Sequence, residues 1–125
     1  MNRALSKARV ERLLDSGLCE SKNPNKHIKE LEKLVSQIDE ENVKRQSYAF
    51  KALADPNRIK ILQLLKNRSM CSCEITMALD LTEPNTSHHL NLLERNNIVR
   101  TEKRGKWIFY ELQQSTIQDM CKKIL

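Results

Sequence analysis

Two short helical segments separated by a tight turn constrain the fold of this chain more than any other feature. Residues 71–79 have a helical pattern, and the turn at Asp80-Leu81 leads to Thr82, whose hydroxyl can cap a second helix. Pro84 falls in the first turn of that helix, where a missing N–H costs nothing. The two segments therefore have the layout of a helix-turn-helix.

The residues after this pair change to a strand pattern. β-Branched and aromatic residues fill residues 98–101 and 107–112, and Gly105 lies in the turn between them, which predicts a β-hairpin. Positions 95 to 106 hold five basic residues and one acid, so a net charge of +4, out of +6 for the whole chain, gathers here. Such a patch favours a polyanionic partner, although a charged run is more often only a solvated surface.

Further helices are expected on both sides of this region. Asp55-Pro56 suits an N-cap followed by a first helical position, and the helix it starts is apolar most of the way round, which indicates a central core helix. Ser115 can cap a last helix whose apolar stripe includes Cys121. The helices expected before the pair cover residues 3–14, 26–38, 42–54 and 57–66, with a loop at 17–25.

The fold class expected from this order is mainly α with one β-hairpin. Two glycines, three prolines and 4% aromatic residues leave little composition for turns and sheets. The chain contains no run of 18 apolar residues, and its first 14 residues alternate charged and apolar side chains. We therefore expect a cytoplasmic protein without a membrane partner, in which the four cysteines are thiols rather than structural disulfides.

Three motifs in this order resemble the ArsR/SmtB family of metal-responsive winged-helix repressors. They are ALADPNRIKIL at residues 52–62, TEPNTSHHL at 82–90, and KRG at 103–105 with YEL at 110–112. The resemblance covers residues 50–112 and implies a DNA-binding repressor rather than an enzyme. It implies a winged helix-turn-helix at 48–112, with helical dimerisation regions at 1–47 and 113–125.

The candidate DNA contacts lie on the second helix of the pair and on the hairpin. Small polar side chains on an outward helix face can hydrogen-bond base edges in the major groove, although the same face is typical of an ordinary solvated helix. Hairpin cations would lie along phosphates and add affinity without sequence preference. His89 is expected to be packed or bonded to backbone. The candidates are Asn85, Thr86, Ser87, His88 and Asn91 on the helix, and Lys103, Arg104 and Lys106 on the hairpin.

A single recognition helix reads only a few base pairs, so useful affinity calls for a dimer on double-stranded DNA. The amphipathic first and last helices are not needed for the helix-turn-helix and are the natural homodimer surface. A two-fold symmetric dimer predicts an inverted-repeat operator.

Cys71 and Cys73 stand where many members of this family carry a Cys-x-Cys pair, although the neighbouring residues differ. On a regular helix they would point about 200° apart, so chelation by both would deform the helix start and disfavour the DNA-bound form. The resemblance implies that Cys19 supplies a third ligand. Three thiolates suit a soft inducer such as arsenite, antimonite, cadmium or lead.

Other roles for the cysteines stay open. Cys71 and Cys73 are also compatible with small buried side chains, Cys19 with an ordinary loop cysteine, and Cys121 with a core or dimer residue. A repressor gated by thiol oxidation, or without an inducer, is an alternative. A small Cys-x-Cys thiol oxidoreductase or metal carrier is a further one, but the sequence lacks a βαβ pattern and the basic hairpin would be unexplained.

Overall fold

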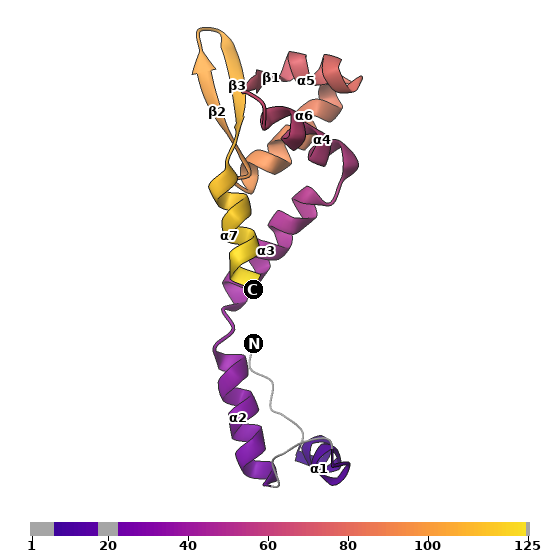
Figure 1. Cartoon of the computed structure of the whole chain (residues 1–125), viewed down its shortest axis with the longest axis vertical. Coiled ribbons are helices and arrows are strands. Elements are labelled where there is room, and N and C mark those ends of the chain that lie inside the picture. Colours follow the sequence, from indigo (N-terminus) through magenta and orange to yellow (C-terminus); the bar gives the residue numbers. More distant parts are fainter. Residues whose placement is uncertain (1–6, 18–22, 125) are drawn as a thin grey trace. The chain divides into compact units, whose positions relative to one another are not determined.

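The computed structural model describes residues 7–17 and 23–124 (Figure 1). The chain forms two compact units, Met1–Lys44 and Arg45–Leu125. Within the described stretches, no helix combines the length and the apolar character needed to cross a membrane.

The first unit contains helices α1 (Lys7–Asp15) and α2 (Pro24–Ser36), which contact each other. Helix α2 begins earlier than the apolar spacing predicted, because the side chain of Asn23 caps it by accepting the N–H groups of Asn25 and Lys26 at 3.1 and 3.3 Å. Residue 24 was expected in a loop, but proline suits the first turn of a helix. The first residues of the helix predicted at 3–14 lie outside the described residues.

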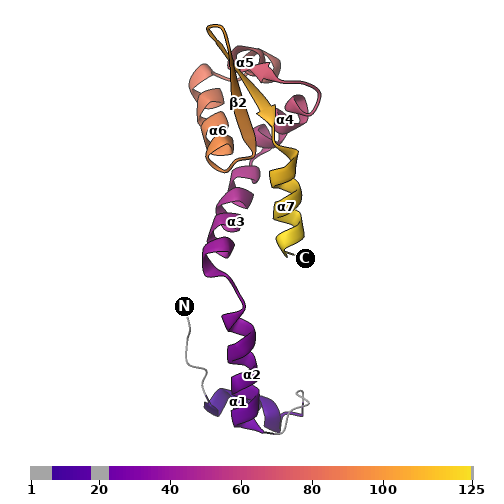
Figure 2. The same ribbon diagram turned by 90° about the vertical axis from the view of Figure 1, so that its left-hand side faces the viewer.

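The second unit is a winged helix-turn-helix. Its three-stranded antiparallel sheet has the order β1-β3-β2, and the tip of the β2–β3 hairpin projects past α6 in both views (Figure 1, Figure 2). Helix α3 starts in the first unit and runs into this one. The elements are α3 (Glu40–Leu53), α4 (Pro56–Leu65), β1 (Met70–Cys71), α5 (Ser72–Leu79), α6 (Glu83–Arg95), β2 (Val99–Arg104), β3 (Trp107–Leu112) and α7 (Gln114–Ile124).

Helix α4 starts as predicted. The carboxylate of Asp55 accepts the N–H groups of Asn57 and Arg58 at 2.9 and 3.1 Å. Burial opposes ionisation of Asp55, but these bonds and the charge of Arg58 outweigh it and lower its pKa. Only one side of α4 is buried: Ile61 is fully enclosed, whereas Ile59 is 46% exposed, so the helix is less surrounded than its composition indicated.

The core joins α3, α4, α5, α6 and α7 with the start of the wing. Each fully buried leucine or isoleucine in it contributes about 1.5–3 kcal/mol relative to an exposed position. Because α6 supplies two of these side chains three residues apart, its inward face is fixed to the core over about one turn. The largest fully buried aliphatic side chains are Ile61, Ile75, Leu90, Leu93, Ile98 and Val99.

Three details of the second unit differ from what the sequence predicted. The strand β1 was missed, since two residues are too short to show a period. Ser115 does not cap α7, which already begins at Gln114 because the preceding Gln113 is tied by its N–H to the carbonyl of Ile98 at 2.8 Å. Cys121 is exposed, so it is not a core residue of the second unit.

Candidate nucleic-acid interface

The turn between α5 and α6 has the geometry that the sequence predicted. Asp80 closes α5 in the left-handed region, with φ of +52°, and the hydroxyl of Thr82 accepts the N–H of Asn85 at 3.2 Å. The hydroxyls of Thr76 and Thr86 lie 2.8 Å apart and join the two helices directly. This bond fixes the orientation of α6 on α5.

Helix α6 divides into a buried face and an exposed polar face. Thr86, His89, Leu90 and Leu93 are buried. Thr86 was a candidate DNA contact, but it is fully enclosed and its hydroxyl donates to the carbonyl of Thr82 at 3.0 Å, so it positions the helix instead. The other four candidates on this helix are exposed: Asn85, Ser87, His88 and Asn91.

Arg58 connects α6 to the rest of the unit, and this role was not predicted from the sequence. Its guanidinium donates to the carbonyls of Ala52 at 2.5 Å and Lys51 at 3.3 Å, which belong to the last turn of α3. A third nitrogen lies 3.1 Å from Nδ1 of His89. Its place in the ALADPNRIKIL motif, in the first turn of α4, was the available signal.

The His89 imidazole is packed, as expected, but its partner is a side chain rather than backbone. Burial lowers its pKa, and the charge of Asp55 opposes this effect while the charge of Arg58 adds to it. A neutral imidazole can accept a hydrogen bond from the Arg58 guanidinium, whereas a protonated one cannot. His89 therefore helps to hold α6 against the rest of the unit, whereas His88 lies on the exposed face of α6.

The wing presents its three candidate cations near the tip. Gly105 has φ of +62°, a conformation that glycine adopts without strain and that allows the two-residue turn. Lys103, Arg104 and Lys106 are exposed. The Lys106 ammonium lies 5.8 Å from the ring centroid of Trp107, and that ring is half exposed.

Arg104 is held more firmly than the two lysines. Its guanidinium lies 4.5 Å from the ring centroid of Phe109 and donates to Glu102 at 3.2 Å and to the hydroxyl of Ser69 at 3.4 Å. Cys71 pairs with Phe109 in the sheet, and Phe109 pairs with Glu102, so these three side chains share one face. Cys71 thus lies in the same cross-strand row as Phe109 and Glu102, the two residues that contact Arg104.

The structure corrects the expected geometry of the cysteines. Cys71 belongs to β1 and is the N-cap of α5 in an extended conformation, so the 200° separation expected for two helical cysteines does not apply. Cys73 lies in the first turn of α5 and is exposed, while Cys71 is half buried. Cys19 lies outside the described residues. Among residues 7–17 and 23–124, no group of three His, Cys, Asp or Glu side chains is placed to hold a metal ion.

Glu74 secures the junction between β1 and α5. Its carboxylate accepts the N–H of Cys71 at 3.3 Å and pairs with Arg68 at 2.5 Å. The bond from Arg68, followed by that from the Cys71 amide, lowers the pKa of Glu74 to about 2. The carboxylate is therefore ionised at neutral pH and holds the backbone of Cys71 in place.

Comparison with known proteins identifies the family. A family described as "Bacterial regulatory protein, arsR family" matches residues 55–101. An uncharacterized HTH-type transcriptional regulator of Methanocaldococcus jannaschii is 39% identical over 85 residues, which are 67% of this chain and 96% of that protein. The transcriptional repressor SdpR of Bacillus subtilis is 39% identical over 76 residues, 61% of this chain and 84% of its own length. This chain belongs to the ArsR family.

The solved structure of HlyU from Vibrio cholerae agrees with this assignment. It is 28% identical, with a TM-score of 0.58, over 69% of this chain and 94% of that one. The ArsR-family protein described here is thus a winged-helix transcriptional repressor and not an enzyme, as the sequence indicated. Regulators of this family bind DNA.

Some relatives of this ArsR-family protein carry the name of a metal or metalloid. The arsenical resistance operon repressor of Bacillus subtilis is 27% identical over 92 residues, 73% of this chain and 88% of its own length. The cadmium resistance regulator CadC of Listeria innocua is 35% identical over 74 residues, 58% of this chain and 62% of its own length.

Proposed function

We propose that this repressor binds an inverted-repeat operator as a homodimer, with α6 in the major groove and the wing on the backbone. One observation carries the proposal: α6 exposes a polar face of short side chains while its opposite face is locked in the core. Short polar side chains there can reach base edges without clashing. The contacts to bases are Asn85, Ser87, His88 and Asn91, and those to phosphates are Lys103, Arg104 and Lys106.

The dimer surface in this proposal is formed by the regions at 1–47 and 113–125. Apolar side chains that a monomer leaves in water support it, since Leu34 is 54% and Ile124 is 59% exposed. A two-fold axis between two copies would place the two recognition helices about one turn of DNA apart.

Selection of bound sequences from random DNA tests the operator and its symmetry. The proposal predicts two half-sites related by a dyad. Loss of a base contact costs about 1–3 kcal/mol, so Ser87→Ala and His88→Ala should each weaken operator binding by about five-fold or more. Gln63→Ala removes an exposed polar side chain from α4 and is the control. Selected sites without dyad symmetry, or equal effects in all three variants, would contradict the proposal.

We further propose that a soft metal or metalloid ion releases the operator by binding to thiolates of Cys71 and Cys73, with a third thiolate from Cys19. Cys73 is exposed and Cys71 is half buried. Their thiolates are the ligands that soft metal ions prefer. Because Cys71 caps α5 and pairs with Phe109, an ion there would act on the β1–α5 junction. The names of the arsenical and cadmium relatives support this chemistry but do not choose the ion.

Titration of the reduced protein–operator complex with arsenite, antimonite, cadmium, lead and zinc tests the second part. At least one soft ion should release the DNA, Cys71→Ser should abolish the release, and Cys121→Ser should preserve it. If none of these ions releases the DNA, the metal-sensing proposal is wrong while DNA binding stands. Release by diamide in place of metal would identify a repressor gated by thiol oxidation.

A further inference from the structure

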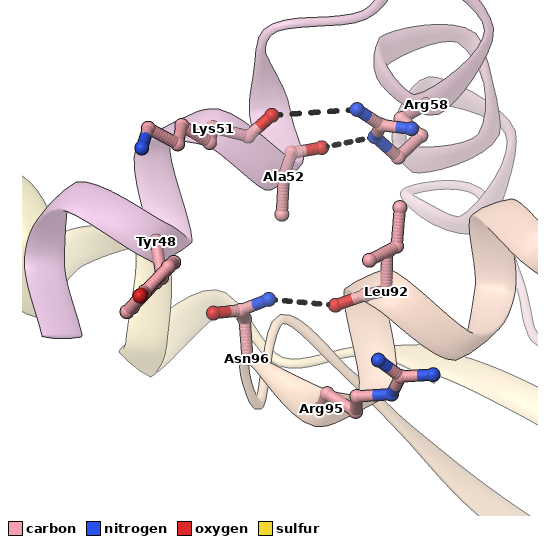
Figure 3. A pocket seen from close by; sticks show the side chains of 7 residues that line it. All are labelled: Tyr48, Lys51, Ala52, Arg58, Leu92, Arg95 and Asn96. Carbon is pink, nitrogen blue, oxygen red and sulfur yellow. Dashed lines mark hydrogen bonds between the residues drawn. The ribbon is translucent and has the colours of Figure 1, made fainter.

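A pocket of about 490 Å³ lies between α3, α4 and α6, away from the cysteines and from the exposed polar face of α6 (Figure 3). Its apolar lining comes from the methyl group of Ala52, the side chain of Leu92 and the ring of Tyr48. Figure 3 shows Ala52 and Leu92 pointing into the same hollow from α3 and α6. The volume falls within the range of about 300–1,000 Å³ that small-molecule sites occupy.

Most of the other residues that line this pocket are cationic. Lys51, Arg58 and Arg95 line it, and none of its lining residues is acidic. In the part of the chain that the structure describes, none of the three cations forms a salt bridge. Arg58 is already bonded to two carbonyls and to His89, and the Lys51 ammonium lies 5.5 Å from the centroid of the Tyr48 ring, so Arg95 is the cation with the fewest contacts. An apolar floor with cations at its edge fits a ligand that has an apolar body and an anionic group.

The pocket is built on the residues that hold the recognition helix. Leu92 and Arg95 belong to α6 itself, and Arg58 joins the end of α3 to His89. An anionic group beside Arg58 would compete with the carbonyls of Lys51 and Ala52 for its N–H groups. A ligand here would therefore change the position or mobility of α6 relative to α3.

We propose that this pocket binds a small aromatic organic anion, such as a carboxylate or sulfonate, which weakens operator binding through α6. The aromatic body lies on Leu92 and Tyr48, and the anionic group pairs with Arg95 and Arg58. This inference rests on the proposed DNA binding by α6, and it is independent of the cysteines. The protein would then respond to an organic effector through a site separate from any thiolate site.

The fluorescent probe 8-anilino-1-naphthalenesulfonate tests the pocket, because it joins an aromatic body to a sulfonate. It is titrated into the full-length native protein, and then into the protein–operator complex. Tyr48→Ala and Arg95→Gln should each weaken probe binding by about five- to ten-fold, the range expected for loss of a stacking or a charge-assisted contact. Lys66→Gln removes an exposed cation from the end of α4, outside the pocket, and is the matched control.

The expected result is one probe per chain, weaker binding in both pocket variants only, and operator affinity reduced about five-fold or more at saturating probe. Equal probe binding in all variants, or bound probe that leaves operator affinity unchanged, would overturn the proposal. If Arg95→Gln instead weakens operator binding in the absence of probe and leaves probe binding intact, Arg95 is a phosphate contact and the proposal fails. Operator binding measured without probe separately tests the proposed function.

Discussion

The side chains that hold α5 and α6 in place make more hydrogen bonds within the protein than the side chains proposed to contact DNA. Glu74 fixes the backbone of Cys71, and Arg58 fixes α6 through His89, whereas Ser87 and His88 are exposed. Substitution of a residue of the first kind should affect folding, whereas substitution of a residue of the second kind should affect only the proposed DNA binding. Substitutions separate the two groups by their effect on the free energy of unfolding.

Glu74→Gln should destabilise the protein at neutral pH, and the difference from wild type should shrink in acid. Because the folded-state pKa of Glu74 is lowered to about 2 from 4.5, its stabilising effect is complete above pH 4.5 and is lost as the pH falls towards 2. Unfolding by denaturant, measured from pH 7 to pH 2, gives both free energies. Asp119→Asn on α7 is the control, and a difference that stays constant with pH would contradict this role of Glu74.

Arg58→Ala should lower the free energy of unfolding by about 2 kcal/mol or more, since it leaves His89 and two carbonyls without their donor. Arg58→Lys keeps the charge but loses the planar fork, so it should restore only part of the loss. Chemical denaturation of the three proteins measures this order. A lysine variant as stable as wild type would show that charge alone matters at this position.

At the scale of elements, long periodic segments and caps were predictable, and short pairings were not. Asp55 and Thr82 cap α4 and α6 where the sequence placed them, because capping depends on one side chain and the next few N–H groups. Strand β1 exists only because β3 lies beside it, so local sequence does not encode it. The position of Cys71 outside the helix follows from that strand.

The candidate site was predictable to the same extent. The exposed face of α6 follows from helical spacing, but Thr86 was wrongly included in it. Thr86 lies four residues before the buried Leu90, so both point to the same side of the helix, and Thr86 is fully buried. The role of Arg58 depends on contacts 31 residues apart, which no periodicity reports. Contacts between residues far apart in the sequence, such as Arg58 and His89, could therefore not be predicted from the sequence pattern.

The wing should supply affinity without sequence preference. Lys103→Gln combined with Lys106→Gln should weaken binding to operator and to unrelated DNA alike, and should reduce the salt slope of log K by about two, one for each phosphate contact. Fluorescence anisotropy at several salt concentrations measures the slope. Lys66→Gln combined with Lys60→Gln on α4 is the charge-matched control, and an unchanged slope in the wing variant would exclude phosphate contacts there.

At the scale of the whole molecule, the proposed function requires two copies of the chain. Exposed apolar residues occur in several places, so their position decides which of them belong to the dimer. Ile124 lies on α7 in the proposed interface, whereas Ile59 lies on α4 outside it, and both are about half exposed. The two isoleucines therefore form a matched pair.

Ile124→Glu should shift the protein from dimer to monomer because it buries an unpaired charge in the interface. Ile59→Glu should leave the dimer intact. Sedimentation equilibrium at micromolar concentration distinguishes the two states. Dimers of equal stability in both variants would place the interface elsewhere.

The central claim is that the outward face of α6 reads sequence, and the ratio of operator affinity to unrelated-DNA affinity tests it most directly. We predict that His88→Ala combined with Asn91→Ala lowers operator affinity by about ten-fold or more while affinity for unrelated DNA stays the same, so the ratio falls. A ratio equal to that of the wild type would show that this face does not recognise bases.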